Sequence, residues 1–318
     1  MTEHDVTLDS MGSEARLVVA GPDAQRAVAS GIAYLARFEA RLSRFRDDSE
    51  LCALNRDPRP EVRASRLLRT AVAAGVWAAE RTGGLVDPTL IAELEAAGYD
   101  RSRRRAELRL ADALLGAPPR APARPHPADR WRAVAVDHDR KTIRRPPGVG
   151  LDTGGTGKGL AADLLADRLA GQERWAVDCG GDLRVGGPDS AGRPFAVEIA
   201  HPLTGERAHV LCLRAGAVAT SGLDVRLWRG AVGAPAHHLL DPATGAPAWT
   251  GLVGATAVAP TALEAETLAK AALLSGPRAA REWLACHGGL IVRDDGDVEL
   301  CGPLRARPVI RLRRPVAA

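Results

Sequence analysis

Apolar residues in the first hundred positions recur at the spacing of amphipathic helices. The first series follows Pro22-Asp23, a typical helix start, and consists of Val28, Ile32, Leu35, Phe38, Leu42 and Phe45. A second series predicts a helix over about 65–81, ending at Gly83-Gly84, with Leu68, Val72, Val76 and Ala79 on its apolar face. A third helical stretch is expected around 90–97. This part of the chain is therefore expected to hold two or three helices.

The second half of the chain changes to short apolar runs separated by turn residues such as Gly180-Gly181-Asp182 and Asp295-Gly296. The predicted strands cover 175–178, 195–199, 210–213, 217–220, 252–259, 290–293 and 298–300. Helical spacing returns over 160–169, 262–275 and 278–286. Hairpin-connected strands with helices packed to one side indicate an α+β fold with antiparallel strands.

A stretch rich in Arg, Pro and Ala interrupts these patterns between 101 and 147. Proline crowding, as in Pro118-Pro119, predicts a connecting loop or linker. Its arginines are compatible with an acidic partner, but a solvated face is the favoured explanation.

Composition excludes some classes of function. The net charge of +4 and the aromatic content of 3% provide neither a basic face nor stacking platforms for nucleic acid. The five cysteines have no metal-ligand or paired spacing and are expected to be reduced thiols. No apolar leader or membrane-spanning run is visible, so a cytoplasmic protein is expected.

The segment 151–163 contains four glycines and one of the chain's three lysines, Lys158, before a predicted helix. Glycines allow backbone N–H groups to approach an anion, and the helix start adds a positive dipole end, so a phosphate-binding loop is one interpretation. A tight strand-to-helix turn is the other. The Walker A pattern is excluded, because Asp152 and Gly159 stand where it requires Gly and Ser or Thr.

Several short motifs accompany this loop in a fixed order. They are Met11-Gly12-Ser13, the Ser49 to Arg56 segment, Gly84 to Thr89, Gly180-Gly181-Asp182, Thr220-Ser221-Gly222, His238 to Gly245 and the helix over 259–276. In this order the chain resembles the ApbE-type FAD:protein FMN transferases from Met11 to about Leu300. The resemblance indicates one continuous domain, with an N-terminal α+β part over 1–100, the connecting segment over 101–147 and an FAD- and metal-binding part over 148–318.

The resemblance implies a T-fold-related protein that binds FAD in a central cleft, uses Mg²⁺ and transfers FMN to a Ser or Thr hydroxyl of an acceptor flavoprotein, releasing AMP. The implied FAD contacts are Met11, Phe45, Leu85, Val86, Asp87, Asp152, Lys158 and Leu240. Without the resemblance, the favoured explanation is that these apolar residues belong to the core and that the aspartates are turn residues. His238 and Lys270 are the candidate catalytic residues. Since imidazole titrates near neutral pH, His238 is expected to accept the proton of the acceptor hydroxyl or to orient the phosphate. A histidine hydrogen-bonded to a turn is the alternative, and His237 is expected on the opposite face.

The implied magnesium site departs from the family pattern. Relatives usually carry Asp and, four positions later, Thr as ligands, with a carbonyl from the glycine loop; here these are Glu266, Lys270 and Gly155. Glu is an acceptable ligand for Mg²⁺, but a protonated Lys repels the ion. Glu266 and Lys270 form either a solvent-exposed i, i+4 ion pair or a site in which Lys270 replaces part of the metal's charge and leaves Mg²⁺ weakly bound or dispensable.

A second departure follows Thr220-Ser221-Gly222, where relatives often place a tyrosine and this chain continues with Leu223 to Arg226. Flavin or acceptor contacts at this position are therefore expected to differ. An FAD-binding or storage protein, or an FAD pyrophosphatase without transfer to protein, is the alternative function.

Overall fold

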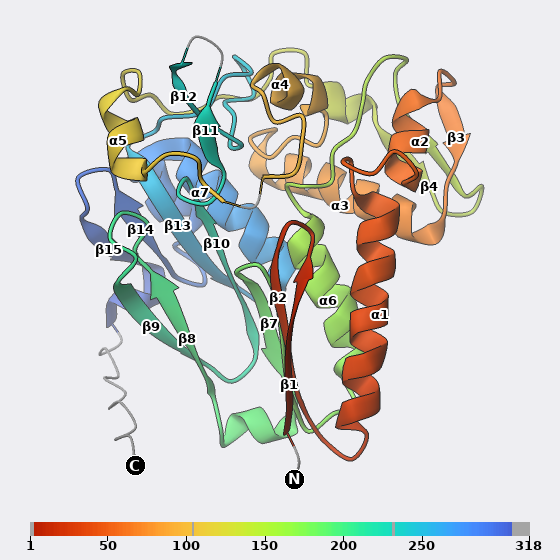
Figure 1. Ribbon diagram of the computed structural model, residues 1–318, viewed down its shortest axis with the longest axis vertical. Coiled ribbons are helices and arrows are strands. Elements are labelled where there is room, and N and C mark those ends of the chain that lie inside the picture. Colours follow the sequence, from red (N-terminus) through yellow and green to blue (C-terminus); the bar gives the residue numbers. More distant parts are fainter. Residues whose placement is uncertain (1–2, 104, 231–232, 307–318) are drawn as a thin grey trace.

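The computed structural model describes residues 3–103, 105–230 and 233–306. Its centre is an eight-stranded sheet in the order β1-β2-β6-β7-β10-β13-β14-β15, with every neighbouring pair antiparallel (Figure 1). The strands are β1 (Glu3–Ser10), β2 (Ser13–Ala20), β6 (Arg174–Cys179), β7 (Asp182–Gly186), β10 (Gly216–Gly222), β13 (Leu252–Ala259), β14 (Gly289–Arg293) and β15 (Val298–Cys301). Central strands such as β13 are buried almost throughout, which explains their continuous apolar sequences.

Three helices cover this sheet. The helix α1 (Ala24–Leu42) packs on β1 and β2, α6 (Gly157–Leu169) on β6 and β7, and α7 (Ala262–Trp283) on β10 and β13. The helices α6 and α7 pack closely at Gly159, where a Cβ atom would lie 2.5 Å from the carbonyl oxygen of Ala262. This close approach brings the start of α6 against the start of α7, and it requires glycine.

The remaining elements gather mainly at the upper end of the molecule in Figure 1. They are α2 (Glu50–Arg56), α3 (Arg66–Thr82), α4 (Ile91–Ala96), α5 (Leu110–Leu115), the sheet of β3 (Glu61–Arg63), β5 (Thr142–Arg144) and β4 (Ala135–Asp137), and the pair β11 (Leu227–Arg229) and β12 (Pro235–His237). The hairpin of β8 (Phe195–Ala200) and β9 (Arg207–Leu213) lies lower, in front of the sheet. Short 3-10 helices occur at Arg130–Ala133, Pro188–Ala191 and Gly302–Ala306.

The antiparallel α+β architecture and all seven predicted strands are confirmed. The two predicted helices over 262–275 and 278–286 are confirmed: both lie in α7, which breaks at Gly276, whose φ of 75° is not helical, and the second ends at Trp283. Of the central sheet, the strands β1, β2 and β7 were not predicted, and neither were the short strands β3, β4, β5, β11 and β12. The hairpin of β1 and β2 turns at Met11 and Gly12, with φ values of 52° and 67°, as two-residue hairpin turns require.

The loop predicted over 101–147 is wrong for part of that segment. It contains α5, a 3-10 helix, β4 and β5, and it buries Leu110, Trp131 and Ile143 against the rest of the protein. These few apolar residues are widely spaced, so they create no periodicity, yet each fills a place in the core. Within the described residues, no helix is both long and apolar enough to cross a bilayer.

Candidate functional site

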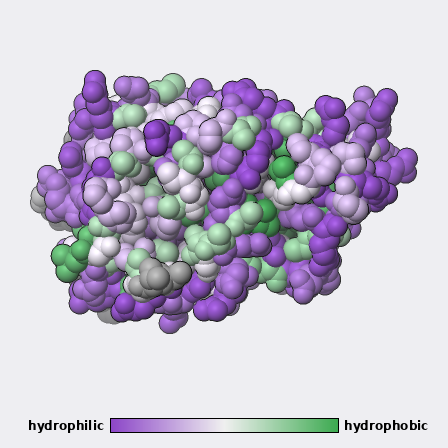
Figure 2. All heavy atoms as spheres, turned by 90° about the horizontal axis from the view of Figure 1, so that it is seen from above, coloured by the Kyte–Doolittle hydropathy of each residue, from purple (hydrophilic) through white to green (hydrophobic). Residues whose placement is uncertain are grey.

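A pocket of about 470 Å³ opens where the β1–β2 turn, the end of α1, the glycine loop, the end of β10 and α7 meet. Figure 2, the view from above, shows a hollow with apolar lining between hydrophilic borders at this end of the molecule. The volume lies within the range that accommodates a cofactor-sized ligand.

The structure brings the sequence-predicted site residues together. The pocket is lined by Met11, Phe45, Leu85, Val86, Asp87, Asp152, Gly155, Lys158, His238, Leu240 and Lys270. Glu266 does not reach the surface of the pocket, because it is completely buried behind Lys270. Segments far apart in the sequence therefore form a single concave surface.

The glycine loop, which is the part of the segment 151–163 that precedes α6, is held by hydrogen bonds to α2 and to Pro88. Asn55 on α2 pairs with Leu151 through two hydrogen bonds of 2.8 Å, one to each of its backbone polar groups. The N–H of Asp152 donates to the carbonyl of Pro88, and the Asp152 carboxylate accepts from the N–H of Gly154. The helix α6 then begins, and the side chain of Thr156 at its N-cap makes no capping hydrogen bond. The N-terminal, positive end of α6 borders the pocket. The Thr156 side chain does not accept a hydrogen bond from the backbone N–H groups there.

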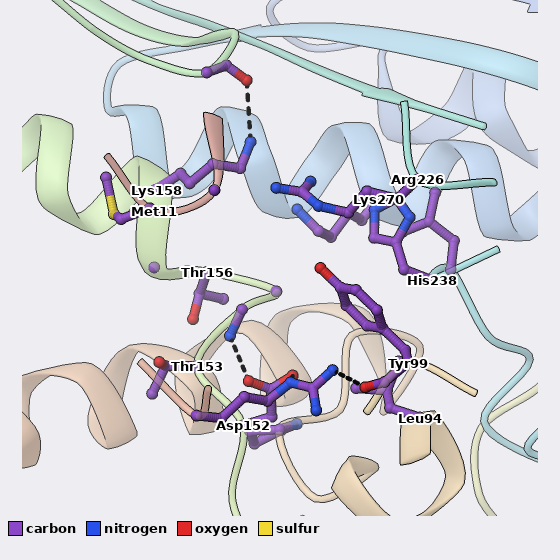
Figure 3. A pocket seen from close by; sticks show the side chains of 18 of the residues that line it. Met11, Leu94, Tyr99, Asp152, Thr153, Thr156, Lys158, Arg226, His238 and Lys270 are labelled. Carbon is purple, nitrogen blue, oxygen red and sulfur yellow. Dashed lines mark hydrogen bonds and ion pairs between the residues drawn. The ribbon is translucent and has the colours of Figure 1, made fainter. Parts of the chain in front are cut away.

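Lys158 is paired with a buried acid. Its Nζ lies 2.7 Å from Oδ2 of Asp182 on β7 and donates to the carbonyl of Gly180 at 3.2 Å. Burial opposes its charge, but Asp182 and Glu266 on balance raise the pKa of Lys158, so it stays protonated. Figure 3 shows the Lys158 side chain along one wall of the pocket.

Glu266 and Lys270 form a buried ion pair, so the interpretation as a solvent-exposed pair is wrong. Glu266 is 0% exposed and Lys270 only 9%. The Lys270 Nζ donates to Glu266 Oε1 at 2.8 Å, and Glu266 Oε2 accepts from the N–H of Gly159 at 2.9 Å. Burial raises the pKa of Glu266, and the nearby Asp182 acts in the same direction.

These contacts do not fit a magnesium ion. Both oxygens of Glu266 already accept hydrogen bonds, and the ammonium of Lys270 occupies the side of the carboxylate that faces the pocket. Across the described ranges, no three or more His, Cys, Asp or Glu side chains are grouped so that they could hold a metal ion. The described side chains therefore form no ready-made cage for a divalent cation, and Glu266 has no carboxylate oxygen without a hydrogen-bond partner to offer one.

His238 follows β12 and faces the pocket, while its neighbour His237 is fully buried and packs edge-on against Trp249 at 4.7 Å. The expectation that the two histidines point to opposite faces is confirmed. The Nδ1 of His238 is buried and has no hydrogen-bond partner. Its pKa is lowered well below the usual value by burial and then by Arg226, His237, Lys270 and Lys158. His238 is therefore neutral and can accept a proton or a hydrogen bond.

Asp87 has a free carboxylate oxygen in the pocket wall. Its Oδ1 accepts from the backbone N–H and the hydroxyl of Thr89 at 2.8 Å and 2.6 Å, whereas its Oδ2 is buried without a partner. Burial raises the pKa of Asp87. An unpaired buried oxygen in a pocket wall is typical of a group that a ligand satisfies.

Three further residues of the site were not among the predicted contacts. Tyr99 stacks on Trp228 with ring centroids 5.4 Å apart, Arg44 lies over the ring of Tyr99 at 4.6 Å, and Arg226 lies beside Tyr99 and His238 (Figure 3). Arg44 also forms an ion pair with Asp152 at 3.7 Å. Tyr99 is one of only two tyrosines, a weak signal, but nothing distinguishes Arg44 or Arg226 among the many arginines.

Comparisons with known proteins agree on one family. The model of the ApbE family matches residues 11–292. Among curated proteins, the FAD:protein FMN transferase of Escherichia coli K12 is 34% identical over 160 residues, covering 49% of this chain and 45% of that protein. The protein of the same name from Klebsiella pneumoniae is 28% identical over 298 residues, covering 90% and 80%. The aligned region thus spans less than half of the Escherichia coli relative and most of the Klebsiella one.

Solved structures show the same fold. The ApbE protein from Thermotoga maritima superposes with a TM-score of 0.78 at 24% identity, covering 96% of this chain and 99% of that one. The flavinyl transferase ApbE from Pseudomonas stutzeri, in its apo form, gives a TM-score of 0.74 at 23% identity, covering 94% and 95%.

Proposed function

Because the chain belongs to the ApbE family, we propose that it is an FAD:protein FMN transferase, which joins the FMN half of FAD to a Ser or Thr hydroxyl of an acceptor flavoprotein and releases AMP. One observation carries this proposal: a pocket with apolar walls in which Lys158, Lys270 and a neutral histidine converge near the start of α6. Such a surface matches a ligand that combines a large ring system with a pyrophosphate.

In this proposal, the flavin and adenine rings lie against the apolar and aromatic walls, which include Met11, Phe45, Leu85, Val86 and Leu240. The unpaired oxygen of Asp87 accepts a hydrogen bond from a ligand N–H or hydroxyl group. The pyrophosphate lies toward Lys158 and the start of α6, where charge and backbone N–H groups favour an anion.

The reaction joins the acceptor's hydroxyl oxygen to the phosphorus of the FMN half. As this bond forms, the bond from that phosphorus to the oxygen of the AMP phosphate breaks, and AMP leaves with the electron pair. His238 takes the hydroxyl proton, since its buried Nδ1 has no other partner. Burial lowers the pKa of His238 most, and the surrounding cations lower it further; a bound pyrophosphate offsets the contribution of the cations and so makes His238 a better base.

The family implies Mg²⁺, with Glu266 and the carbonyl of Gly155 as the ligands that remain in this sequence. The contacts of Glu266 do not favour such an ion, so no step of the proposed reaction uses it. Lys158 and the start of α6 instead provide positive charge where negative charge develops on the leaving phosphate.

The test incubates the protein with FAD and a Thr-containing acceptor peptide and measures AMP release and the mass of the peptide. Transfer adds FMN to the peptide and releases an equal amount of AMP. AMP without labelled peptide indicates a pyrophosphatase, and bound, intact FAD indicates a storage protein; either result would refute the proposal.

A matched pair of histidine variants sharpens this test. His238→Asn is expected to lower the rate of transfer at least 100-fold, because it removes the proton acceptor. His287→Asn changes an exposed histidine that does not line the pocket, and it is expected to leave the rate unchanged. The Ser/Thr motif of the acceptor and the cytoplasmic location of this protein stay predictions. Both are checked by fractionating cells and identifying the proteins that carry FMN.

A further inference from the structure

The cations of the pocket differ in how they are compensated. Four of them form ion pairs with carboxylates: Arg44 with Asp152 at 3.7 Å, Arg46 with Asp48 at 3.1 Å, Lys158 with Asp182 at 2.7 Å and Lys270 with Glu266 at 2.8 Å. The fifth, Arg226, has no ion pair with a carboxylate in the described part of the chain, although it also lines the pocket. Arg226 therefore carries positive charge that the protein itself leaves unneutralised.

Arg226 is held in place by its neighbours. It lies between β10 and β11, directly before Leu227, which is 1% exposed and pairs with His237. Its Nη2 donates to the hydroxyl of Ser13 at 3.2 Å, which links it to the β1–β2 turn. The backbone is thus anchored, and most of the guanidinium's donors remain for a ligand.

Arg226 and Lys270 lie next to each other beside His238, as Figure 3 shows. Both also contribute to the low pKa of His238, which agrees with their proximity. Lys270 is fixed by Glu266, whose second oxygen is fixed by Gly159. Two positive groups from different elements therefore stand on one side of the pocket in fixed positions.

We propose that Arg226 and Lys270 together bind the pyrophosphate of FAD, and that this binding needs no divalent cation. The identity of the ligand rests on the proposed function. Arg226 contributes the positive charge that the protein leaves unneutralised, and Lys270, although paired with Glu266, contributes a second cationic donor to the negatively charged pyrophosphate. The planar fork of arginine bonds two phosphate oxygens at once, and the lysine ammonium acts as a point charge. The cluster thereby supplies positive charge that a metal ion would otherwise supply, since both oxygens of Glu266 already accept hydrogen bonds.

The test measures binding to the purified full chain with three probes, in EDTA and in excess Mg²⁺. FAD carries both flavin and pyrophosphate, ADP carries only the pyrophosphate with the adenosine half, and riboflavin carries only the flavin. Wild-type protein is expected to bind FAD with the same affinity, within twofold, in EDTA and in Mg²⁺.

Arg226→Gln is expected to weaken the binding of FAD and ADP roughly 10- to 100-fold, because charge-assisted hydrogen bonds to phosphate are lost. Riboflavin binding is expected to stay unchanged. Arg229→Gln is the matched control, since Arg229 is exposed on β11 and does not line the pocket; its three affinities are expected to equal those of the wild type.

For Lys270, the double substitution Lys270→Met with Glu266→Gln removes both charges of the buried pair and avoids leaving an unpaired carboxylate. It is expected to weaken FAD and ADP binding about tenfold and to spare riboflavin. Thermal unfolding of each variant shows that it is folded before binding is compared.

The proposal is overturned if EDTA abolishes FAD binding and Mg²⁺ restores it, if Arg226→Gln leaves FAD binding unchanged, or if it weakens riboflavin as much as FAD. These outcomes are independent of the proposed function. Charge-dependent FAD binding without peptide labelling supports this inference and refutes the transferase, whereas peptide labelling by a protein whose FAD binding requires Mg²⁺ supports the transferase and refutes this inference.

Discussion

The two buried lysine pairs of the pocket, Lys158–Asp182 and Lys270–Glu266, look alike but connect the molecule differently. Asp182 lies on β7, so the first pair joins the start of α6 to the sheet, and Lys158 also contacts the carbonyl of Gly180. The second pair lies within one turn of α7. Glu266 itself connects α7 to α6, because it accepts the N–H of Gly159.

Both lysines line the pocket, so this difference concerns how much each one also contributes to the stability of the fold. In the first pair, the buried charge of Asp182 on β7 is compensated by a lysine from another element, Lys158 on α6. The acid of the second pair keeps a backbone partner on α6 when its lysine is removed. Lys158 is therefore expected to contribute more to the stability of the fold than Lys270. Substitution of Lys270 is expected to affect ligand binding more than stability.

The largest effect is expected for Lys158→Met, which leaves the carboxylate of Asp182, 1% exposed, without its cation. Breaking a buried pair by removing one partner costs about 3–5 kcal/mol. Chemical denaturation measures this loss. The double variant Lys158→Met with Asp182→Asn is expected to regain about half of it or more, because no charge is left buried. Equal stability of the single and double variants contradicts the assigned role of the pair.

An intermediate effect is expected for Gly159→Ala. This variant tests whether the positions of both lysine pairs depend on the close packing of α6 against α7. The added Cβ would lie 2.5 Å from the carbonyl oxygen of Ala262, a backbone atom that can move only with α7. Overpacking of this kind costs about 1–3 kcal/mol.

Gly159→Ala is also expected to weaken FAD binding at least tenfold, because α7 carries Lys270 and Glu266 loses its hydrogen bond when the helices separate. Gly171→Ala is the control, since no atom lies within 4 Å of the Cβ it adds. If the Gly159→Ala protein is destabilised but its affinity for FAD is unchanged, the positions of the pocket lysines do not depend on this packing of α6 against α7.

Much of this arrangement follows from the sequence, and the reasons differ by element. The apolar period of α1 and the continuous apolar runs of β13 and β14 determine their structure locally. The pattern in β1, where Val6 and Leu8 alternate with polar residues, is also typical of a strand. Trp131 and Ile143 are buried by long-range packing that no local pattern encodes.

The residues of the candidate site also fall into those that local motifs predict and those that only long-range packing brings together. The glycine loop and the turn at Asp87 come from short motifs in a fixed order, so their residues were predicted together. Arg44, Tyr99 and Arg226 enter from segments that become neighbours only after folding. The helical spacing of Glu266 and Lys270 predicted their contact, but not that the contact is buried, because burial depends on how α6 packs on α7.

The smallest effect, and the one that depends on pH, is expected for Lys270→Met. Burial and Asp182 raise the pKa of Glu266 above 4.5, and Lys270 opposes this rise, so the variant's Glu266 has a still higher pKa. A carboxyl group whose pKa is raised in the folded state contributes stability at low pH that is lost as the pH rises, from about 4.5 upward. The variant is therefore expected to lose about 1–2 kcal/mol near pH 8, where Glu266 ionises without its lysine, and almost nothing near pH 5.5. Denaturation at both pH values, with Lys270→Met/Glu266→Gln as the control that lacks the titrating group, measures this difference. A loss that is equal at both pH values, or larger at the lower one, contradicts the idea that Glu266 can protonate when Lys270 is absent, and with it the distinction between the two lysine pairs.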